Sequence, residues 1–325
     1  MMRRREFITL LGGAAAAWPL AARAQQTMPV IGFLNAQAPT GFAHLVAAFH
    51  RGLKDEGFIE GENVVVEYRW GEREVARLPG LAADLVRRQV AVLVATGGAH
   101  AAGIAASRTI PVICTFGGDP VRPGFVESVN RPGKNVTGIM VLTADLEAKR
   151  LELLHELVPS PGSFGVLLDP TFPDAEAHLK EVQFAARTLG RDIRVTNASI
   201  EKEIDTAFET LVQSRVTALA VGAGPLFYNR RNQVIALAAR HRIPAIYENR
   251  ETALAGGLMS YGVSVPGVYR QIGRYTGRVL KGESPAELPV EQPSHFEFVI
   301  NLKTAKALGL DIPPTLLARA DEVIE

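Results

Sequence analysis

Short apolar runs alternate with longer amphipathic segments along most of the chain. Residues 30–34 form the unbroken apolar run VIGFL, which predicts a buried strand. The segment after it, residues 41–58, carries apolar side chains at helical spacing: Phe42, Leu45, Val46, Phe49 and Leu53. Strands that alternate with helices favour a parallel sheet covered on both faces. The pattern therefore predicts an α/β fold.

The alternation falls into two series, separated by a strongly periodic segment over residues 145–159. Predicted strands of the first series lie near residues 30–34, 63–70, 90–96, 110–116 and 136–142, and those of the second near 164–169, 192–198, 216–222 and 243–248. Each series predicts one doubly wound parallel-sheet lobe. We expect lobe one to comprise residues 28–142 and 250–286, and lobe two residues 143–249 and 287–325, with crossings near residues 142, 250 and 287.

The first 24 residues have the pattern of an export signal. Three arginines at positions 3–5 precede an apolar run over residues 8–20, and Ala-Arg-Ala at 22–24 is a small-x-small cleavage site. The apolar run is shorter than the ~20 residues that a helix needs to cross a bilayer. We expect cleavage after Ala24 and a mature protein in the periplasm, without stable membrane insertion. The arginines are typical of twin-arginine export, and an ordinary Sec signal is the alternative.

Composition and the motifs that are missing exclude several classes of function. The formal net charge of +1, with no basic block, argues against a nucleic-acid partner. The sequence contains no G-x-G-x-x-G or Walker A motif, and its seven histidines are scattered, so that we expect neither a cofactor nor a metal site. Ser264 stands as in a nucleophile elbow, but the final glycine of that motif is missing. The single cysteine, Cys114, excludes an intrachain disulfide.

Two glycine pairs stand where the predicted fold would place a ligand. In open parallel sheets, ligands bind beyond the carboxyl ends of the strands. Gly97-Gly98 and Gly117-Gly118 each follow a predicted strand. Glycines allow backbone N–H groups to approach a ligand closely, and a helix N-terminus just beyond favours an anion, so that a carboxylate is the expected guest. The alternative for each pair is a tight strand-to-helix turn without a ligand.

Acidic and aromatic residues in the same group of loops complete the candidate site. Asp119 follows a glycine pair and Glu248 ends a predicted strand, so that either carboxylate could bind a ligand ammonium. The alternative is a surface acid that caps a helix or pairs with an arginine. Aromatic rings in these loops could stack on a ligand or pack in the core. The candidate ligand-binding residues are Asn35, Phe42, Thr96, Gly97, Gly98, Gly117, Gly118, Asp119, Thr171, Phe172, Phe227, Glu248 and Tyr261.

Several stretches together resemble one family: the periplasmic solute-binding proteins of ABC transporters whose better-described members handle tryptophan, tyrosine or phenylalanine. They include IGFLNAQAP (31–39), TFGGDP (115–120), AGGLMSYG (255–262) and the stretch 301–325. The resemblance covers roughly Met28 to Glu325. Many relatives carry Trp where this chain has Asn249.

The resemblance implies a type I periplasmic-binding fold, in which two lobes joined by three crossings close on a small solute without catalysis. An amino acid is the expected solute, and an ABC permease in the inner membrane is the implied partner. We expect the paired glycines to bind a solute carboxylate, Asp119 or Glu248 to bind an ammonium, and Phe227 or Tyr261 to line a side-chain pocket. The alternative function is an exported, cofactor-dependent oxidoreductase, since twin-arginine export often serves such enzymes.

Overall fold

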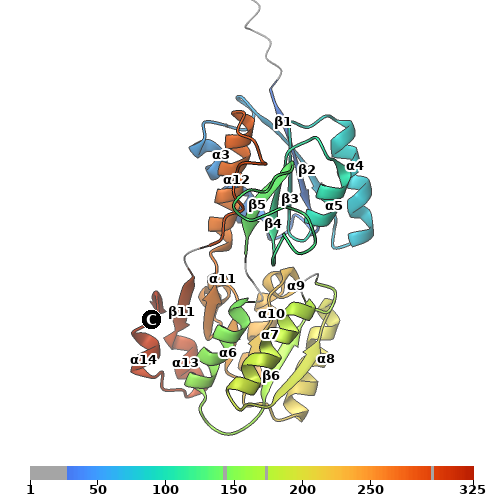
Figure 1. The fold of residues 1–325 in the computed structure, drawn as a ribbon. Coiled ribbons are helices and arrows are strands. Elements are labelled where there is room, and N and C mark those ends of the chain that lie inside the picture. Colours follow the sequence, from blue (N-terminus) through green and yellow to red (C-terminus); the bar gives the residue numbers. More distant parts are fainter. Residues whose placement is uncertain (1–27, 142–144, 173–174, 294–295) are drawn as a thin grey trace, which may run out of the picture.

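Two α/β lobes, one above the other in Figure 1, make up the protein. The computed structural model describes residues 28–141, 145–172, 175–293 and 296–325. The predicted export signal, residues 1–24, lies outside these ranges. Within them, no helix is both long and apolar enough to span a membrane.

The first lobe contains a five-stranded sheet in the order β2-β1-β3-β4-β5, and all its strands pair in parallel. The strands are β1 (Val30–Asn35), β2 (Val65–Trp70), β3 (Val92–Thr96), β4 (Val112–Phe116) and β5 (Val136–Met140). Because the strands are parallel, their carboxyl ends and the loops that follow them lie at one edge of the sheet.

Alternate residues of each strand face opposite sides of this sheet, as the pleat requires. Ile31 and Phe33 pack with residues of helices α3 (Ala43–Asp55) and α12 (Val265–Leu280), whereas Leu34 packs with residues of α4 (Leu78–Arg87). The short helices η1 (Val75–Arg77) and α5 (His100–Ala106) complete the lobe. Helices thus cover both faces, with α3 and α12 on one side of the sheet and α4 and α5 on the other (Figure 1).

Helix α12 belongs to the first lobe although it follows most of the second lobe in sequence. It packs against α3 at backbone distance: a Cβ atom on Gly52 would lie 1.8 Å from the carbonyl oxygen of Arg270. A glycine at position 52 is therefore what allows the two helices to approach this closely. The contact anchors the returning chain to the first lobe.

The second lobe contains a seven-stranded sheet in the order β12-β11-β10-β9-β8-β6-β7. The strands are β6 (Phe164–Leu168), β7 (Ile193–Asn197), β8 (Ala218–Val221), β9 (Ala245–Tyr247), β10 (Met259–Gly262), β11 (Glu297–Asn301) and β12 (Glu322–Ile324). The helices are α6 (Asp145–Leu157), α7 (Ala175–Thr188), α8 (Glu201–Gln213), α9 (Pro225–Asn229), α10 (Arg231–Arg240), α11 (Arg250–Leu254), α13 (Leu302–Leu308) and α14 (Pro314–Leu317). The predicted architecture of two doubly wound lobes is confirmed.

One strand pair departs from the expected parallel arrangement. Strand β11 runs antiparallel to β10, whereas the other pairs of this sheet are parallel. The reason is topological: β10 leads the chain toward the first lobe, where α12 packs, and β11 brings the chain back from that lobe in the opposite direction.

Two predicted lobe boundaries need correction. Residues 250–262 belong to the second lobe rather than the first, because β10 pairs with β9; the chain crosses between Gly262 and Val265, not near residue 250. The return lies beyond residue 287, since the N–H of Glu291 donates to the carbonyl of Gly138 in β5 (3.0 Å) and β11 begins at Glu297. The crossing predicted near residue 142 lies outside the described residues.

Candidate ligand-binding site

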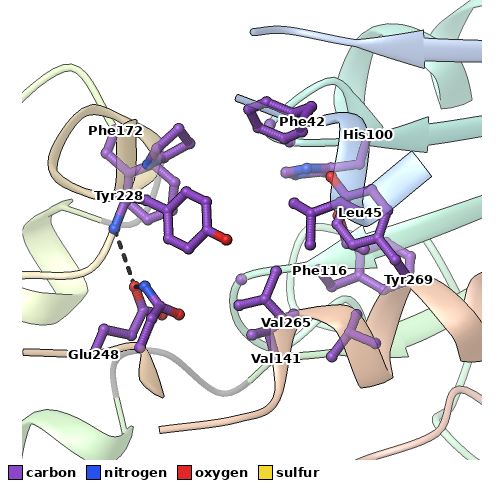
Figure 2. A pocket seen from close by; sticks show the side chains of 18 residues that line it. Phe42, Leu45, His100, Phe116, Val141, Phe172, Tyr228, Glu248, Val265 and Tyr269 are labelled. Atoms are coloured by element: carbon purple, nitrogen blue, oxygen red, sulfur yellow. Dashed lines mark hydrogen bonds between the residues drawn. The ribbon is translucent and has the colours of Figure 1, made fainter. Parts of the chain in front are cut away.

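A cavity lies between the two lobes, at the carboxyl ends of strands from both sheets (Figure 2). The first lobe contributes Phe42, Leu45, Gly97, Gly98, His100, Thr115, Phe116, Gly117, Val141, Val265, Val268 and Tyr269. The second lobe contributes Phe172, Gly224, Pro225, Tyr228, Glu248 and Asn249. The lining is mostly apolar with a few polar groups, the usual character of a small-molecule site.

The structure brings part of the predicted set together at this cavity. Phe42, Gly97, Gly98, Gly117, Phe172 and Glu248 line it. Asn35, Thr96, Gly118, Asp119, Thr171, Phe227 and Tyr261 do not. Asn35 and Thr96 are fully buried just beneath the Gly97-Gly98 turn, and Asn35 donates to Thr96 through a side-chain hydrogen bond of 3.0 Å.

Two of the predicted residues that do not line the cavity make hydrogen bonds within their own loops. The exposed Asp119 accepts a hydrogen bond from the N–H of Val121 through Oδ1 (2.8 Å), which closes a turn of its own loop. The hydroxyl of Thr171 donates to Oδ1 of Asp169 (2.7 Å) in a similar turn. Asp119 is not among the residues that line the cavity, whereas Glu248 is.

The two aromatic candidates for the side-chain pocket pack elsewhere. Phe227 is buried in the core of the second lobe, in the same cluster as Phe208. The ring of Tyr261 makes an edge contact with Phe298, and its backbone carbonyl accepts a hydrogen bond from Nε of Arg150 (2.9 Å). Neither ring lines the cavity, so the predicted pocket for the ligand side chain has to be reassigned.

Aromatic rings from both lobes flank the cavity instead. Figure 2 shows Phe172 and Tyr228 on the side of the second lobe, facing Phe42, Phe116 and Tyr269 across the open space. Such rings offer flat apolar surfaces on which an aromatic group can stack.

The Gly97-Gly98 turn lines the cavity on the side of the first lobe. The φ angles of Gly97 and Gly98 are +61° and +97°, in the region that disfavours residues with a Cβ atom. Within the described residues, neither N–H donates to a protein acceptor. At Gly97 there is also no room for a side chain, because a Cβ atom would lie 2.5 Å from Oδ1 of Asn35.

Glu248 is the one acidic residue among those that line the cavity in the described part of the chain. Its Oε2 accepts long hydrogen bonds of 3.4 Å from the N–H of Gly224 and from Nδ2 of Asn249. Burial raises the pKa of the Glu248 carboxyl, and the positive charges of Arg150 and His178 only partly oppose this shift. The carboxylate is thus held in the wall of an apolar cavity, where a cationic group would stabilise its ionised form.

A buried ionic cluster supports this wall from inside the second lobe. Oε1 of Glu147 lies 2.6 Å from Nη1 of Arg150 and 2.8 Å from Nδ1 of His178, and all three side chains are at most 1% exposed. Although burial opposes ionisation, these two partners hold the pKa of Glu147 below its ordinary value. The His178 ring also makes an edge contact with Phe172 in the cavity wall, at 5.8 Å between centroids.

Comparison with known families decides the assignment. The model of the family described as ABC transporter substrate binding protein matches residues 35–324 of this chain. The chain belongs to this family of substrate-binding proteins. Its members bind solutes for ABC transporters, in agreement with a cavity between two lobes.

Individual relatives of this substrate-binding protein are distant in sequence. The chain is 26% identical over 265 residues to a tyrosine-binding protein of Clostridioides difficile (strain R20291), covering 81% of this chain and 75% of that protein.

Two solved structures share the fold closely. A conserved domain protein from Vibrio cholerae has a TM-score of 0.83 with 23% identity, covering 91% of this chain and all of that one. The ABC domain from Streptococcus pneumonia in complex with L-Trp has a TM-score of 0.82 with 24% identity, covering 92% of this chain and all of that one. The predicted type I periplasmic-binding fold is confirmed by these likenesses.

Several lining residues of the substrate-binding protein were missed by sequence reasoning. Tyr228 directly follows the predicted Phe227; both lie on α9, where successive side chains point about 100° apart, so one ring faces the core and the next faces the cavity. A closer count of helical phase in this loop could have found Tyr228. Tyr269 gave no such signal, because only tertiary packing brings α12 to the first sheet.

Proposed function

We propose that this protein captures an α-amino acid with an aromatic side chain between its two lobes and delivers it to an ABC permease. The main support for the proposal is that hydrogen-bond donors for an anion and a carboxylate for a cation line the same apolar cavity, on opposite lobes. The first lobe offers the N–H groups of Gly97 and Gly98, and the second lobe offers the carboxylate of Glu248. A zwitterion has complementary charges for both.

The carboxylate of the solute would bind the Gly97-Gly98 turn. Both N–H groups lie beside the cavity without a protein acceptor among the described residues, and hydrogen bonds to a charged acceptor are stronger than those to a neutral one. The ammonium of the solute would bind Glu248. In return, the cation would add to the partial stabilisation that the positive charges of Arg150 and His178 give to this half-buried carboxylate.

The side chain of the solute would lie among the aromatic rings of the two lobes. Phe42 and Phe116 come from the first lobe, and Phe172 and Tyr228 come from the second (Figure 2). Stacking on these rings favours an aromatic over an aliphatic side chain. The names of the relatives agree with this choice, since one is a tyrosine-binding protein and another was solved with L-Trp.

Transport follows from hinge closure. A ligand held by loops of both lobes stabilises the closed arrangement through contacts that the open arrangement cannot make, and the permease would recognise the closed form. The export pattern of residues 1–24 supports action in the periplasm. Permease and compartment are both part of this proposal.

A thermal-shift screen tests the proposed function. The purified protein is heated with each natural amino acid and, for the aromatic ones, with the matching amine and the matching carboxylic acid. A ligand at 100 times its Kd adds about 2.7 kcal/mol to the stability, which is a readily measured shift in Tm. We expect the largest shift with an aromatic L-amino acid and smaller shifts with its one-charge analogues. No shift with any amino acid would contradict the proposal.

A further inference from the structure

We propose that Asn35 is a positioning residue for the ligand: it holds the Gly97-Gly98 turn in its ligand-receiving conformation and ties this turn to helix α12. The expected effect of Asn35 on ligand affinity rests on the proposed function. Its effect on the conformation of the turn does not depend on that function. Asn35 does not line the cavity, so that its effect has to pass through the residues that do.

All the hydrogen bonds of the Asn35 side chain are directed at the neighbourhood of the turn. Oδ1 accepts from the N–H of Gln37 (2.8 Å), and Nδ2 donates to Oγ1 of Thr96 (3.0 Å) and to the hydroxyl of Tyr269 (3.3 Å). The residue is 0% exposed, which fixes the side chain in one place. A buried amide with its partners satisfied resists displacement, because breaking these bonds would leave polar atoms unpaired.

The turn rests directly on this amide. The Cβ position of Gly97 lies 2.5 Å from Oδ1 and 2.8 Å from Nδ2 of Asn35. A second link runs through Gln37, whose backbone is held by Asn35 and whose Nε2 donates to the carbonyl of Gly97 (3.3 Å). Asn35 therefore supports the turn from below and, through Gln37, from one side.

The same amide reaches the helix that follows the second crossing. Tyr269 lies on α12 and lines the cavity on the side of the first lobe (Figure 2). Burial raises the pKa of Tyr269 to about 12, so its hydroxyl stays protonated at neutral pH and the contact with Asn35 persists. Through Asn35, the turn and helix α12, which follows the second crossing, share one hydrogen-bonded support.

A purely stabilising role makes a different prediction from a positioning role. If Asn35 only stabilised the first lobe, its loss would lower the Tm without a local change at the turn. If it positions the turn, its loss frees the N–H groups of Gly97 and Gly98 to move. Ligands that use these groups would then lose more affinity than ligands that do not.

The variants are Asn35→Ala and Asn35→Asp, with Thr137→Val as the control. Thr137 is also fully buried in the first sheet, and its hydroxyl donates to the carbonyl of Leu288 (2.6 Å), but it does not line the cavity. Its valine variant loses a buried hydrogen bond of the same lobe without touching the turn. The aspartate variant keeps an oxygen acceptor for the N–H of Gln37.

The first measurement is amide hydrogen exchange of Ala99 in the ligand-free protein, because the buried Ala99 N–H donates to the carbonyl of Thr96 (3.1 Å) and so closes the Gly97-Gly98 turn. We expect exchange at least about tenfold faster in Asn35→Ala, intermediate rates in Asn35→Asp, and unchanged rates in Thr137→Val. Unchanged exchange in Asn35→Ala, or equal acceleration in Thr137→Val, would overturn the proposal.

The second measurement is calorimetric titration with L-tryptophan and with tryptamine, which lacks the carboxylate. We expect Asn35→Ala to weaken L-tryptophan by roughly tenfold or more and tryptamine by less than about threefold. Equal weakening of both ligands would overturn the positioning role. If the wild-type protein bound neither ligand, the proposed function would fail in its tryptophan form, while the exchange experiment would still decide the role of Asn35.

Discussion

His44 and Tyr228 join the two lobes directly, with 2.5 Å between Nε2 of His44 on α3 and the hydroxyl of Tyr228 on α9. Their rings are stacked at 24°, and the guanidinium of Arg231 lies 5.2 Å from the centroid of the Tyr228 ring. Tyr228 also packs with the core cluster of the first lobe and lines the cavity. One side chain of the second lobe therefore both contacts the first lobe and lines the cavity.

Replacing Tyr228 with Phe should weaken ligand binding while leaving the ring in place. The change removes the hydroxyl that bonds His44 across the lobes, and a hydrogen bond contributes ~0.5–1.5 kcal/mol, equivalent to a 2- to 12-fold change in Kd. The measurement is calorimetric titration of the variant with the amino acid that gives the largest thermal shift.

Tyr275→Phe is the matched control for this variant. The hydroxyl of Tyr275 donates to the carbonyl of Pro289 (3.0 Å), both residues belong to the first lobe, and Tyr275 does not line the cavity. We expect its Kd to equal that of the wild type even if its Tm falls. Equal losses of affinity in both variants would mean that the contact between His44 and Tyr228 has no specific part in closure.

Replacing Glu248 with Gln should separate ligands by their amino group. The change removes the negative charge in the cavity wall, and a hydrogen bond to a charged group contributes ~1.5–3 kcal/mol, so affinity for an aromatic amino acid should fall 10- to 150-fold. Affinity for indole-3-propionate, which has no ammonium, should not fall. Asp119→Asn serves as the control, because Asp119 was the other predicted partner of an ammonium and does not line the cavity. A larger loss in Asp119→Asn than in Glu248→Gln would reverse the assignment.

In the ligand-free protein, the stability should depend on pH in a way that reflects the raised pKa of Glu248. Burial raises the pKa of this carboxyl in the folded state above its ordinary value of 4.5. A raised pKa means that the folded state holds the proton more tightly, so the contribution of Glu248 to stability is present below pH 4.5 and is lost as pH rises through the folded pKa.

Urea unfolding of the wild type and Glu248→Gln between pH 4 and pH 8 checks this sign. At neutral pH the glutamine variant should be the more stable protein, because it carries no buried charge. The difference should shrink as pH falls toward 4.5. A difference that stays constant over this range would show that the carboxyl ionises as freely as in the unfolded chain.

Gly97→Ala should lower the stability of the protein more than Gly190→Ala, although both glycines have similar positive φ angles. Gly97 has φ +61° and Gly190 has φ +63°, so alanine at either position meets a similar left-handed penalty of roughly 1–2 kcal/mol. Only at Gly97 does the new Cβ also meet Asn35, since no atom lies within 4 Å of the Cβ position of Gly190. Urea unfolding should show the larger loss for Gly97→Ala, and ligand affinity should fall in this variant alone. Similar losses in the two variants would contradict the close fit between the turn and Asn35.

The sequence predicted the elements well because local patterns determine them. Apolar runs marked the strands, and the Gly97-Gly98 pair marked a turn that the structure places at the cavity. The sequence-based prediction was wrong where contacts between residues distant in sequence determine which lobe a segment joins. Residues 250–262 were predicted to belong to the first lobe, and the pairing of β10 with β9 assigns them to the second.

The predicted loops line the cavity more often than the individual predicted side chains do. Asp119 and Glu248 both follow strands. Asp119 accepts a hydrogen bond within its own loop, whereas Glu248 lines the cavity, and this difference depends on the local turn. Phe227 and Tyr228 are neighbours in sequence, and the orientation of a five-residue helix decides which ring faces the ligand space. Single-residue differences of this kind need helix phase and loop geometry, which periodicity does not supply.

A crystal structure of the protein with the amino acid that gives the largest thermal shift tests the central claim most directly. We predict one ligand molecule between the lobes, with its carboxylate at the N–H groups of Gly97 and Gly98, its ammonium at Glu248, and its ring among Phe42, Phe172 and Tyr228. Electron density for the ligand outside the interlobe cavity, or with its carboxylate directed at Glu248, would contradict it.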